Sequence, residues 1–261
     1  MGWDVSLGDR MQSLLDRRLP LRTRVDLLAA DLRRRRSARR DLHGVRYGPA
    51  RVYLSDADFG IDRASFVFAV AEANYATDYV DAVVLDIGSH KGYFAAYAAT
   101  HGARTVVAYE PESANFAVLE RTASGYGGWR LVRAAVDAAP GRSDLQVMSG
   151  SWGHALHPPV SFAEHQVGVE SVEVVALADV LQEGSSLRAG KGRLVVKLNI
   201  EGAECSAILD TPPSAWTGVD EVFVETHPWA TCDAAQLATR LSSSGLSRVP
   251  SAHPAVLRMH R

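Results

Sequence analysis

Asp86, Gly88, Gly92 and Glu110 have the residue types and the spacing of a cofactor-binding site. In the segment VVLDIGSHKGYF, residues 83–94, an apolar run leads through Asp86 into a turn that contains both glycines. Glu110 ends the next apolar run. A strand, a glycine turn and a helix, followed by a strand that ends in an acidic residue, form a nucleotide-binding half-sheet. In this layout the carboxylate of Glu110 can accept hydrogen bonds from both hydroxyls of a ribose.

The spacing in this turn favours S-adenosylmethionine (SAM) over NAD. A dinucleotide fingerprint is G-x-G-x-x-G, whose close glycines let backbone NH groups reach a pyrophosphate, whereas this chain reads D-x-G-x-x-x-G. A carboxylate at Asp86 would also repel a diphosphate by on the order of 4 kcal/mol at about 4 Å and an effective dielectric of about 20. SAM has an ammonium and a sulfonium and no phosphate. The alternative is that Asp86 only caps the following helix and that the glycines only relieve crowding.

Further cofactor positions follow from the same layout. Ser89 and Tyr93 lie in the turn and at the start of the next helix, so we expect them to contact the cofactor. Adenine needs a flat apolar slot, which the end of the third strand supplies in a doubly wound sheet. This places Ala134, Ala135 and Val136 at the slot, although the same residues are also ordinary strand core.

Asn199, Glu201 and His227 are the candidates for catalysis. Asn199 lies at the end of the buried strand of residues 193–200 and Glu201 directly follows it, and His227 follows the strand of residues 219–226. Because strand carboxyl ends line the ligand crevice in such sheets, these side chains should face the reacting end of the cofactor. His227, with a reference pKa of about 6.5, is a reasonable general base, and Glu201 is the rival. Glu204 more simply caps or braces the following helix.

The loop of residues 149–159 is rich in Gly, Ser and Pro and contains His154 and His157. It could cover an acceptor molecule, although such loops are more often merely mobile.

Alternating strand and helix patterns position these residues. Strands at residues 83–87, 105–110, 129–136, 193–200 and 219–226 alternate with helices, which predicts a doubly wound, mainly parallel Rossmann-like α/β sheet. A terminal hairpin should add an antiparallel edge strand, and residues 143–148 and 169–177 should pair as antiparallel strands. We expect an N-terminal helical extension at residues 1–63, packed through Leu21, Val25, Leu28 and Leu32, and the cofactor-binding domain at residues 64–261.

Composition and charge exclude several classes of protein. No apolar run approaches the roughly 18–20 residues of a membrane helix, and the N-terminal residues do not form a secretory signal. Residues 1–50 contain 12 Arg and 6 Asp, a net charge of +6 in a chain of net charge −2. The basic run of residues 33–40 is either a solvated helix face or an arm that meets an acidic or carrier-bound substrate. No aromatic residues interleave with it, which argues against nucleic acid.

The two cysteines, Cys205 and Cys232, are far apart and lack a C-x-x-C partner. Their isolation argues against a disulfide framework or a structural zinc site, and it favours a reducing, cytoplasmic location. We predict no metal site.

The segments VVLDIGSHKGYFAAYAA, AYEPESANFAVLE, AAVDAAPGRSDL, VVKLNIEGAE and FVETH occur in this order. With them, residues 64–227 resemble the FkbM-type methyltransferases. The resemblance implies the class I SAM-dependent methyltransferase fold and O-methylation of a sugar or specialised-metabolite hydroxyl, as in natural product biosynthesis. It also implies that Asp86, Gly88, Gly92, Glu110 and Asn115 are cofactor positions.

The chain departs from the family pattern at three positions. The family usually has aspartate where this chain has Asn199, which argues against a divalent metal or an aspartate base there. His90 and Lys91 replace small or apolar residues in the turn. Three alternatives to an O-methyltransferase stay open: an N-methyltransferase, an NAD-dependent oxidoreductase and a non-catalytic binding protein on the same scaffold.

Overall fold

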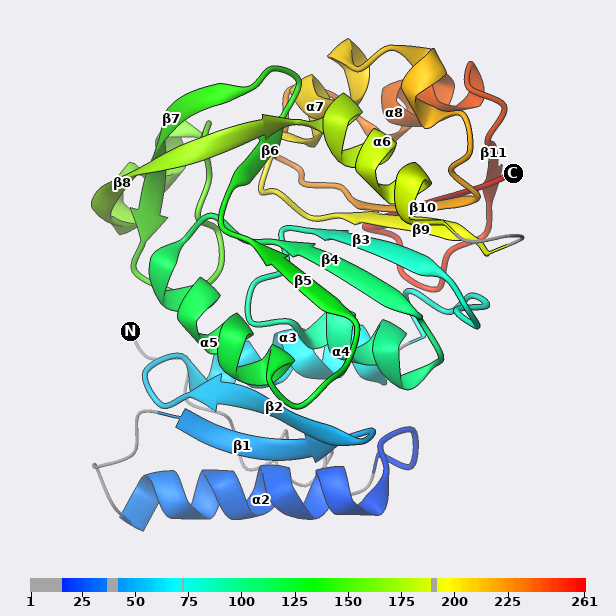
Figure 1. Cartoon of the computed structure of the whole chain (residues 1–261). Coiled ribbons are helices and arrows are strands. Elements are labelled where there is room, and N and C mark those ends of the chain that lie inside the picture. The colour runs from blue at the N-terminus through cyan, green and yellow to red at the C-terminus, as the bar shows by residue number, and fades with distance from the viewer. Residues whose placement is uncertain (1–15, 37–41, 72, 189–191) are drawn as a thin grey trace.

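The computed structural model describes residues 16–36, 42–71, 73–188 and 192–261, and its centre is a seven-stranded sheet (Figure 1). The strand order is β11-β12-β10-β9-β3-β4-β5. The strands are β3 (Val83–Ile87), β4 (Thr105–Tyr109), β5 (Trp129–Val132), β9 (Leu194–Leu198), β10 (Glu221–Glu225), β11 (Ser247–Val249) and β12 (Val256–His260).

The central strands are short, rich in β-branched residues and buried on both faces, as parallel strands between two helical layers must be. From β3 the chain moves to β4 and β5 on one side, and it later adds β9 and β10 on the other. The strand order therefore reverses between β3 and β9, which is where ligands bind in such sheets.

The terminal hairpin adds an antiparallel edge strand, as predicted. β12 is antiparallel to β10, and β11, which is antiparallel to β12, forms the edge.

Helices cover both faces of the sheet, which confirms the predicted doubly wound fold (Figure 1). One layer contains α3 (Phe59–Val70), α4 (Tyr93–Thr100) and α5 (Ser113–Ala123). The other contains α6 (Leu177–Leu187), α7 (Glu204–Asp210) and α8 (Ala234–Ser242). No helix in the described ranges is long and apolar enough to cross a membrane.

The N-terminal residues add two further layers below α3, α4 and α5. The hairpin of β1 (Leu42–Tyr47) and β2 (Ala50–Ser55) lies against these helices, and α2 (Leu21–Arg36) lies beneath the hairpin (Figure 1). Side chains from this hairpin, from α3 and from the lower face of the sheet form one hydrophobic cluster. The predicted boundary between residues 63 and 64 falls within α3, which is continuous across it.

The predicted apolar face of α2 is wrong. Three of its residues are largely exposed: Leu21 (66%), Val25 (48%) and Leu32 (45%). The buried face instead contains Thr23 and Asp26, whose polarity concealed it in the sequence pattern. The hydroxyl of Thr23 donates to the carbonyl of Arg46 (2.7 Å), and the carboxylate of Asp26 accepts from the guanidinium of Arg46 (2.7 Å).

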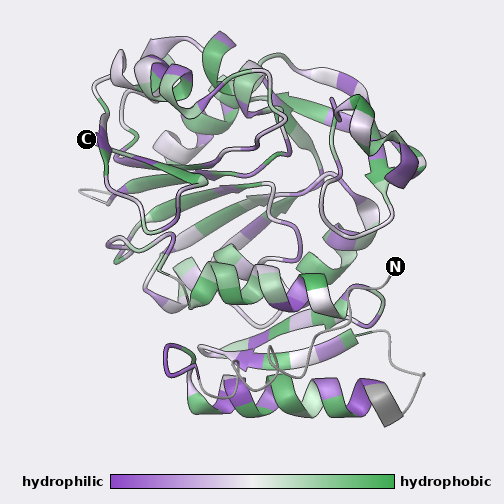
Figure 2. Cartoon of the chain, turned by 180° about the vertical axis from the view of Figure 1, so that it is seen from behind, coloured by the Kyte–Doolittle hydropathy of each residue, from purple (hydrophilic) through white to green (hydrophobic). Residues whose placement is uncertain are grey.

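The basic run begins at the end of α2, far below the sheet. Arg33 is exposed there and donates to the carbonyl of Ala29. Residues 37–40, the second half of the run, lie outside the described residues. Its described part belongs to the layer farthest from the main sheet (Figure 1, and from behind in Figure 2).

A second, three-stranded sheet rises beside the main one. It has the order β6-β8-β7, with β6 (Ala135–Asp137), β7 (Gly141–Met148) and β8 (Gln166–Ala176). The antiparallel pairing of β7 and β8 confirms the prediction, whereas the single strand expected at residues 129–136 divides into β5 and β6. This division carries the chain from the main sheet to the small one.

Cys205 and Cys232 form a disulfide, which corrects the expectation of two unpaired thiols. Cys205 lies in α7 and Cys232 precedes α8, and these helices follow the neighbouring strands β9 and β10. The sheet thus brings their Cα atoms to 5.6 Å, although 27 positions separate them in the sequence. The pairing removes the basis for predicting a reducing compartment.

We expect loss of this crosslink to lower the free energy of unfolding by roughly 2–4 kcal/mol, because the disulfide restricts the unfolded chain. Urea denaturation of the wild type and of the Cys205→Ala/Cys232→Ala variant, each with and without dithiothreitol, measures the difference. The reductant should affect only the wild type. Equal unfolding midpoints for both proteins would contradict the expectation.

Candidate functional site

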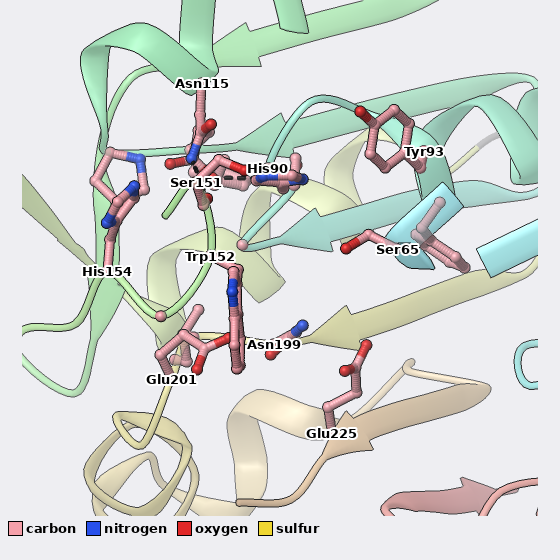
Figure 3. A pocket seen from close by; sticks show the side chains of 18 of the residues that line it. Ser65, His90, Tyr93, Asn115, Ser151, Trp152, His154, Asn199, Glu201 and Glu225 are labelled. Carbon is pink, nitrogen blue, oxygen red and sulfur yellow. Dashed lines mark hydrogen bonds between the residues drawn. The ribbon is translucent and has the colours of Figure 1, made fainter. Parts of the chain in front are cut away.

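A cavity of about 480 Å³ lies at the carboxyl ends of the central strands (Figure 3). Its size is typical of small-molecule sites. One part, the turn side, is lined by Gly88, Ser89, Glu110, Pro111, Asn115, Ala134, Ala135, Val136 and Leu145. The other part, the α3 side, is lined by Ile61, Ala64, Ser65, Phe68, Tyr75, Trp152, Glu225 and His227. Lys197, Asn199 and Glu201 also line the cavity.

The turn after β3 needs its glycines. Gly88 and Gly92 have φ values of +76° and +85°, in the left-handed region that favours glycine. A Cβ atom at Gly88 would lie 1.8 Å from the carbonyl oxygen of Asn199. Gly88 therefore allows the turn to pack directly against the end of β9.

Four of the backbone NH groups of this turn, those of Gly88, Ser89, His90 and Gly92, donate within the protein. Those of Gly88 and Ser89 donate to the carbonyl of Tyr109 at 3.0 and 2.9 Å. The NH group of His90 donates to the carboxylate of Glu110 at 2.8 Å, and that of Gly92 to the carbonyl of Ser89 at 2.8 Å. A pyrophosphate site needs such groups free to donate to phosphate oxygens. This turn is therefore not organised to bind a dinucleotide.

Asp86, predicted to face the cofactor, lies behind the turn. Its side chain is fully buried, and it is not among the described residues that line the cavity. The ammonium of Lys197 lies 3.2 Å from its carboxylate and donates to the carbonyl of Gly88 at 2.7 Å. Asp86 and Lys197 thus form a buried ion pair that supports the turn.

Glu110 has the position predicted for it. Its two carboxylate oxygens accept from the NH groups of His90 (2.8 Å) and Glu112 (3.0 Å), which fix the side chain at the cavity wall. Burial raises the pKa of Glu110 to about 8, although these two NH groups oppose the shift. Each oxygen keeps a lone pair for a further donor.

Of the other predicted cofactor residues, Gly92 is not among the described lining residues, whereas the rest line the cavity with polar atoms that are partly engaged. The hydroxyl of Ser89 donates to the carbonyl of Asp86 (2.7 Å), and that of Tyr93 donates to the carbonyl of Tyr53 (3.0 Å). The amide of Asn115 donates to the carbonyl of Ser151 (2.8 Å), so Asn115 anchors the loop of residues 149–159. Ala135 lies in the apolar slot. Tyr93 therefore shapes the cavity with its ring.

Buried acceptors without a donor are found where the sequence predicted catalysis. The side-chain oxygen of Asn199 and one carboxylate oxygen of Glu201 are buried and have no hydrogen-bond partner. Glu201 also has a φ of +56°, a strained conformation for a residue with a Cβ. Such strain and unpaired polar atoms are concentrated at functional sites.

Glu204 holds this strained loop. Its carboxylate accepts from the NH groups of Ile200 (2.6 Å) and Gly202 (2.8 Å), on either side of Glu201. Glu204 therefore braces the loop before α7 and does not cap the following helix as had been predicted.

His227 lies between two carboxylates. Its ring nitrogens are 3.5 Å from Glu201 and 3.4 Å from Glu204, and Trp229 packs on the ring with centroids 4.7 Å apart. Burial alone would lower the pKa of His227, but the two carboxylates outweigh it and raise the pKa to about 9. Burial raises the pKa of Glu201 to about 7, although His227 opposes the shift. At neutral pH His227 is therefore an imidazolium.

The loop of residues 149–159 contributes to the cavity in part. Ser151, Trp152, Gly153 and His154 line it, as a covering loop should. His157 is not in the described lining and lies 3.7 Å from Asp137 at the surface.

The contribution of α3 to the cavity was not predicted from the sequence. Helix α3 presents Ile61, Ser65 and Phe68 to the cavity, and Tyr75 donates a hydrogen bond to Glu225. Figure 3 shows the carboxyl group of Glu225 directed into the space between Asn199 and Ser65. The only signal in the sequence was Glu225 itself, at a strand end.

The ion pair between Lys91 and Asp62 was also not predicted from the sequence. It explains why a lysine occupies this position, one of the departures from the family pattern. The ammonium of Lys91 lies 2.6 and 2.8 Å from the two carboxylate oxygens of Asp62, and both side chains are buried. Asp62 also accepts from the NH and hydroxyl groups of Ser55 and from the hydroxyl of Ser151. Asp62 thus joins the glycine turn, the N-terminal hairpin and the covering loop.

Within the described part of the chain, no group of three or more His, Cys, Asp and Glu side chains is arranged to hold a metal ion.

No family model matches the sequence, and no curated protein matches it either. Solved structures do match. They include a SAM-dependent methyltransferase from Agrobacterium tumefaciens, 7% identical over 85% of this chain and 70% of that one (TM-score 0.43). Fibrillarin of Aeropyrum pernix, solved with natively bound SAM, is 10% identical over 76% of this chain and 73% of that one (TM-score 0.40). The Methanococcus jannaschii fibrillarin pre-rRNA processing protein is 10% identical, with coverages of 84% and 82% (TM-score 0.43). Likeness at this level says nothing about what this chain binds.

Proposed function

We propose that the chain is a SAM-dependent methyltransferase. The observation that carries the proposal is that Glu110 lies at the cavity wall with acceptor capacity left, beside a turn in which four backbone NH groups already donate within the protein. Such a site suits a nucleoside whose ribose donates to a carboxylate and whose remainder bears no phosphate. Asp86 was expected to attract the cationic end of SAM, but its charge is balanced by Lys197.

The residues of the cavity fit SAM from one end to the other. Glu110 would accept from the ribose hydroxyls, and the apolar slot at Ala134, Ala135 and Val136 would hold adenine. The side-chain oxygen of Asn199, which has no hydrogen-bond partner, is a suitable acceptor for the ammonium group of the methionine part of SAM. When bound, SAM supplies a methyl group already activated by its sulfonium.

The chain must align the acceptor, exclude water and remove the hydroxyl proton. Positioning alone can supply roughly 7–11 kcal/mol. Glu201 is the better candidate for the base, because its pKa of about 7 makes it a carboxylate near neutral pH. His227, with a pKa of about 9, already holds its proton and serves as the counter-ion that orients Glu201.

The acceptor is a small molecule with a hydroxyl group, in line with the FkbM-type resemblance. The α3 side supports this assignment, since it is a partly apolar pocket and not a basic groove for nucleic acid. The small-molecule, RNA and protein fractions of an extract of the source cells can each be incubated with the chain and methyl-labelled SAM. Label in the small-molecule fraction, with mass spectra showing an O-methyl product, is expected. Label only in RNA or protein, or an N-methyl product, would overturn the assignment.

We expect SAM affinity to rise with pH up to about 8 and then to level off. Ribose hydroxyls donate best to the ionised form of Glu110, whose pKa of about 8 must fall when they bind. Below that pKa, binding therefore releases a proton and weakens as the pH falls. Calorimetric titration at pH 6.5, 7.5 and 8.5 measures this, with Glu110→Gln as the control. The variant should bind about 10- to 100-fold more weakly above pH 8 and lose this pH dependence. Unchanged affinity in the variant would remove Glu110 from the ribose site.

A further inference from the structure

The α3 side of the cavity contains a carboxylate that the reaction does not use. Glu225 ends β10 and accepts a hydrogen bond at one oxygen from the hydroxyl of Tyr75, which is buried (1% exposed). No Lys, Arg or His in the described ranges forms an ion pair with Glu225. Its carboxyl group therefore faces the cavity without an ion-pair partner among the described residues, and its only described cationic neighbour is His227, whose pKa it helps to raise (Figure 3).

The cations of the cavity are committed elsewhere. Lys197 pairs with Asp86 and donates to the carbonyl of Gly88. His227 lies between Glu201 and Glu204. Burial lowers the pKa of His90 and of His154, so both rings are neutral at pH 7. An anionic acceptor would meet two carboxylates, Glu225 and Glu201, and find no free cation among the described lining residues.

The wall near Glu225 suits an organic cation. Phe68 and Trp152 line the cavity, and the ring of Phe68 packs against Tyr75, which donates to Glu225, with centroids 5.9 Å apart. Aromatic faces attract cations, most strongly where water is excluded. A carboxylate with an aromatic wall is the chemistry that recognises an ammonium group.

We propose that Glu225 binds an ammonium group on the acceptor, so that the substrate class is a hydroxylated amine. The inference rests on the proposed methyltransferase function and deepens it. The ammonium lies at Glu225, and the hydroxyl that receives the methyl group lies at Glu201. An acidic acceptor, one of the possibilities that the basic N-terminal run suggested, is disfavoured by the same two carboxylates.

Three phenols of similar size test the proposal on the full chain saturated with S-adenosylhomocysteine: tyramine, 4-ethylphenol and 3-(4-hydroxyphenyl)propanoate. They carry an ammonium, no charge and a carboxylate. We expect tyramine to bind at least 10-fold more tightly than the carboxylate by calorimetry. Glu225→Gln should reduce this preference at least 10-fold, and Glu225→Lys should reverse it. Glu173→Gln, which alters an exposed carboxylate of β8, should leave it unchanged.

The outcomes separate this inference from the proposed function. Absence of S-adenosylhomocysteine binding would overturn the methyltransferase function and this inference with it. Normal binding of S-adenosylhomocysteine without a preference for tyramine, or without binding of any of the three phenols, would overturn this inference alone. Weaker binding of S-adenosylhomocysteine to Glu225→Gln would instead make Glu225 a cofactor ligand and also overturn it.

Discussion

Glu201→Gln should lower the turnover number by about 10²- to 10³-fold at pH 8, while the affinity for S-adenosylhomocysteine stays at the wild-type value. A positioned general base contributes about 10²- to 10⁴-fold, and glutamine keeps the size of the side chain but cannot accept the proton. The side chain of Glu201 is buried beside His227, in a strained conformation that Glu204 maintains. Steady-state kinetics and calorimetry on the same preparation measure the two quantities. Glu164→Gln, at an exposed carboxylate, is the control.

The pH profile distinguishes Glu201 from His227 as the base. Wild-type turnover should rise as Glu201 ionises, with a midpoint at about pH 7, and fall away below it. His227→Gln removes the positive charge that stabilises the Glu201 carboxylate, so the midpoint should move to higher pH and turnover should recover in alkaline buffer. Full turnover of Glu201→Gln, together with a His227→Gln variant that is inactive at every pH, would make His227 the base.

Asp62→Ala should lower the free energy of unfolding by about 3–5 kcal/mol. The substitution leaves the ammonium of Lys91 buried without its partner, and removing one member of a buried ion pair has a cost of this size. It also removes the acceptor for Ser55 and Ser151. Urea denaturation monitored by circular dichroism measures the loss.

Two comparisons control this stability measurement. The double variant Asp62→Leu/Lys91→Met, which removes both charges, should recover most of the lost stability. Glu170→Gln breaks the more exposed pair with Arg133 and should cost less than about 1 kcal/mol. An Asp62→Ala protein as stable as the Glu170→Gln protein would show that the Asp62–Lys91 pair does not anchor the turn.

The sheet could be predicted from the sequence because its strands are buried on both faces. Apolar runs such as VVLDI and LVVKL have few other structures open to them, and the residues directly after their ends, Gly88 and Asn199, line the cavity. Glu110, Asn199 and Glu201 were therefore found from their places at strand ends. Helix α2 was predicted with the wrong face, because Thr23 and Asp26 bury polar groups that the pairing with Arg46 satisfies.

The contacts between distant segments could not be predicted. Asp62 and Lys91 meet only because the hairpin and α3 pack beneath the glycine turn, and Cys205 meets Cys232 only because β9 and β10 are neighbours. Asp86 has the residue type expected of a cofactor ligand, but Lys197 opposite it in the β3–β9 register takes up its charge. The spacing of residues along the chain does not indicate any of these pairings.

The central claim is that this cavity accepts an adenosyl cofactor with a cationic end and refuses a diphosphate. The most direct test is calorimetric titration of the purified, ligand-free chain with SAM and with NAD, in the same buffer at pH 8. The structure predicts saturable one-site binding of SAM, weakened by Glu110→Gln, and no heat of binding from NAD. Binding of NAD at that site, with none of SAM, would contradict the claim.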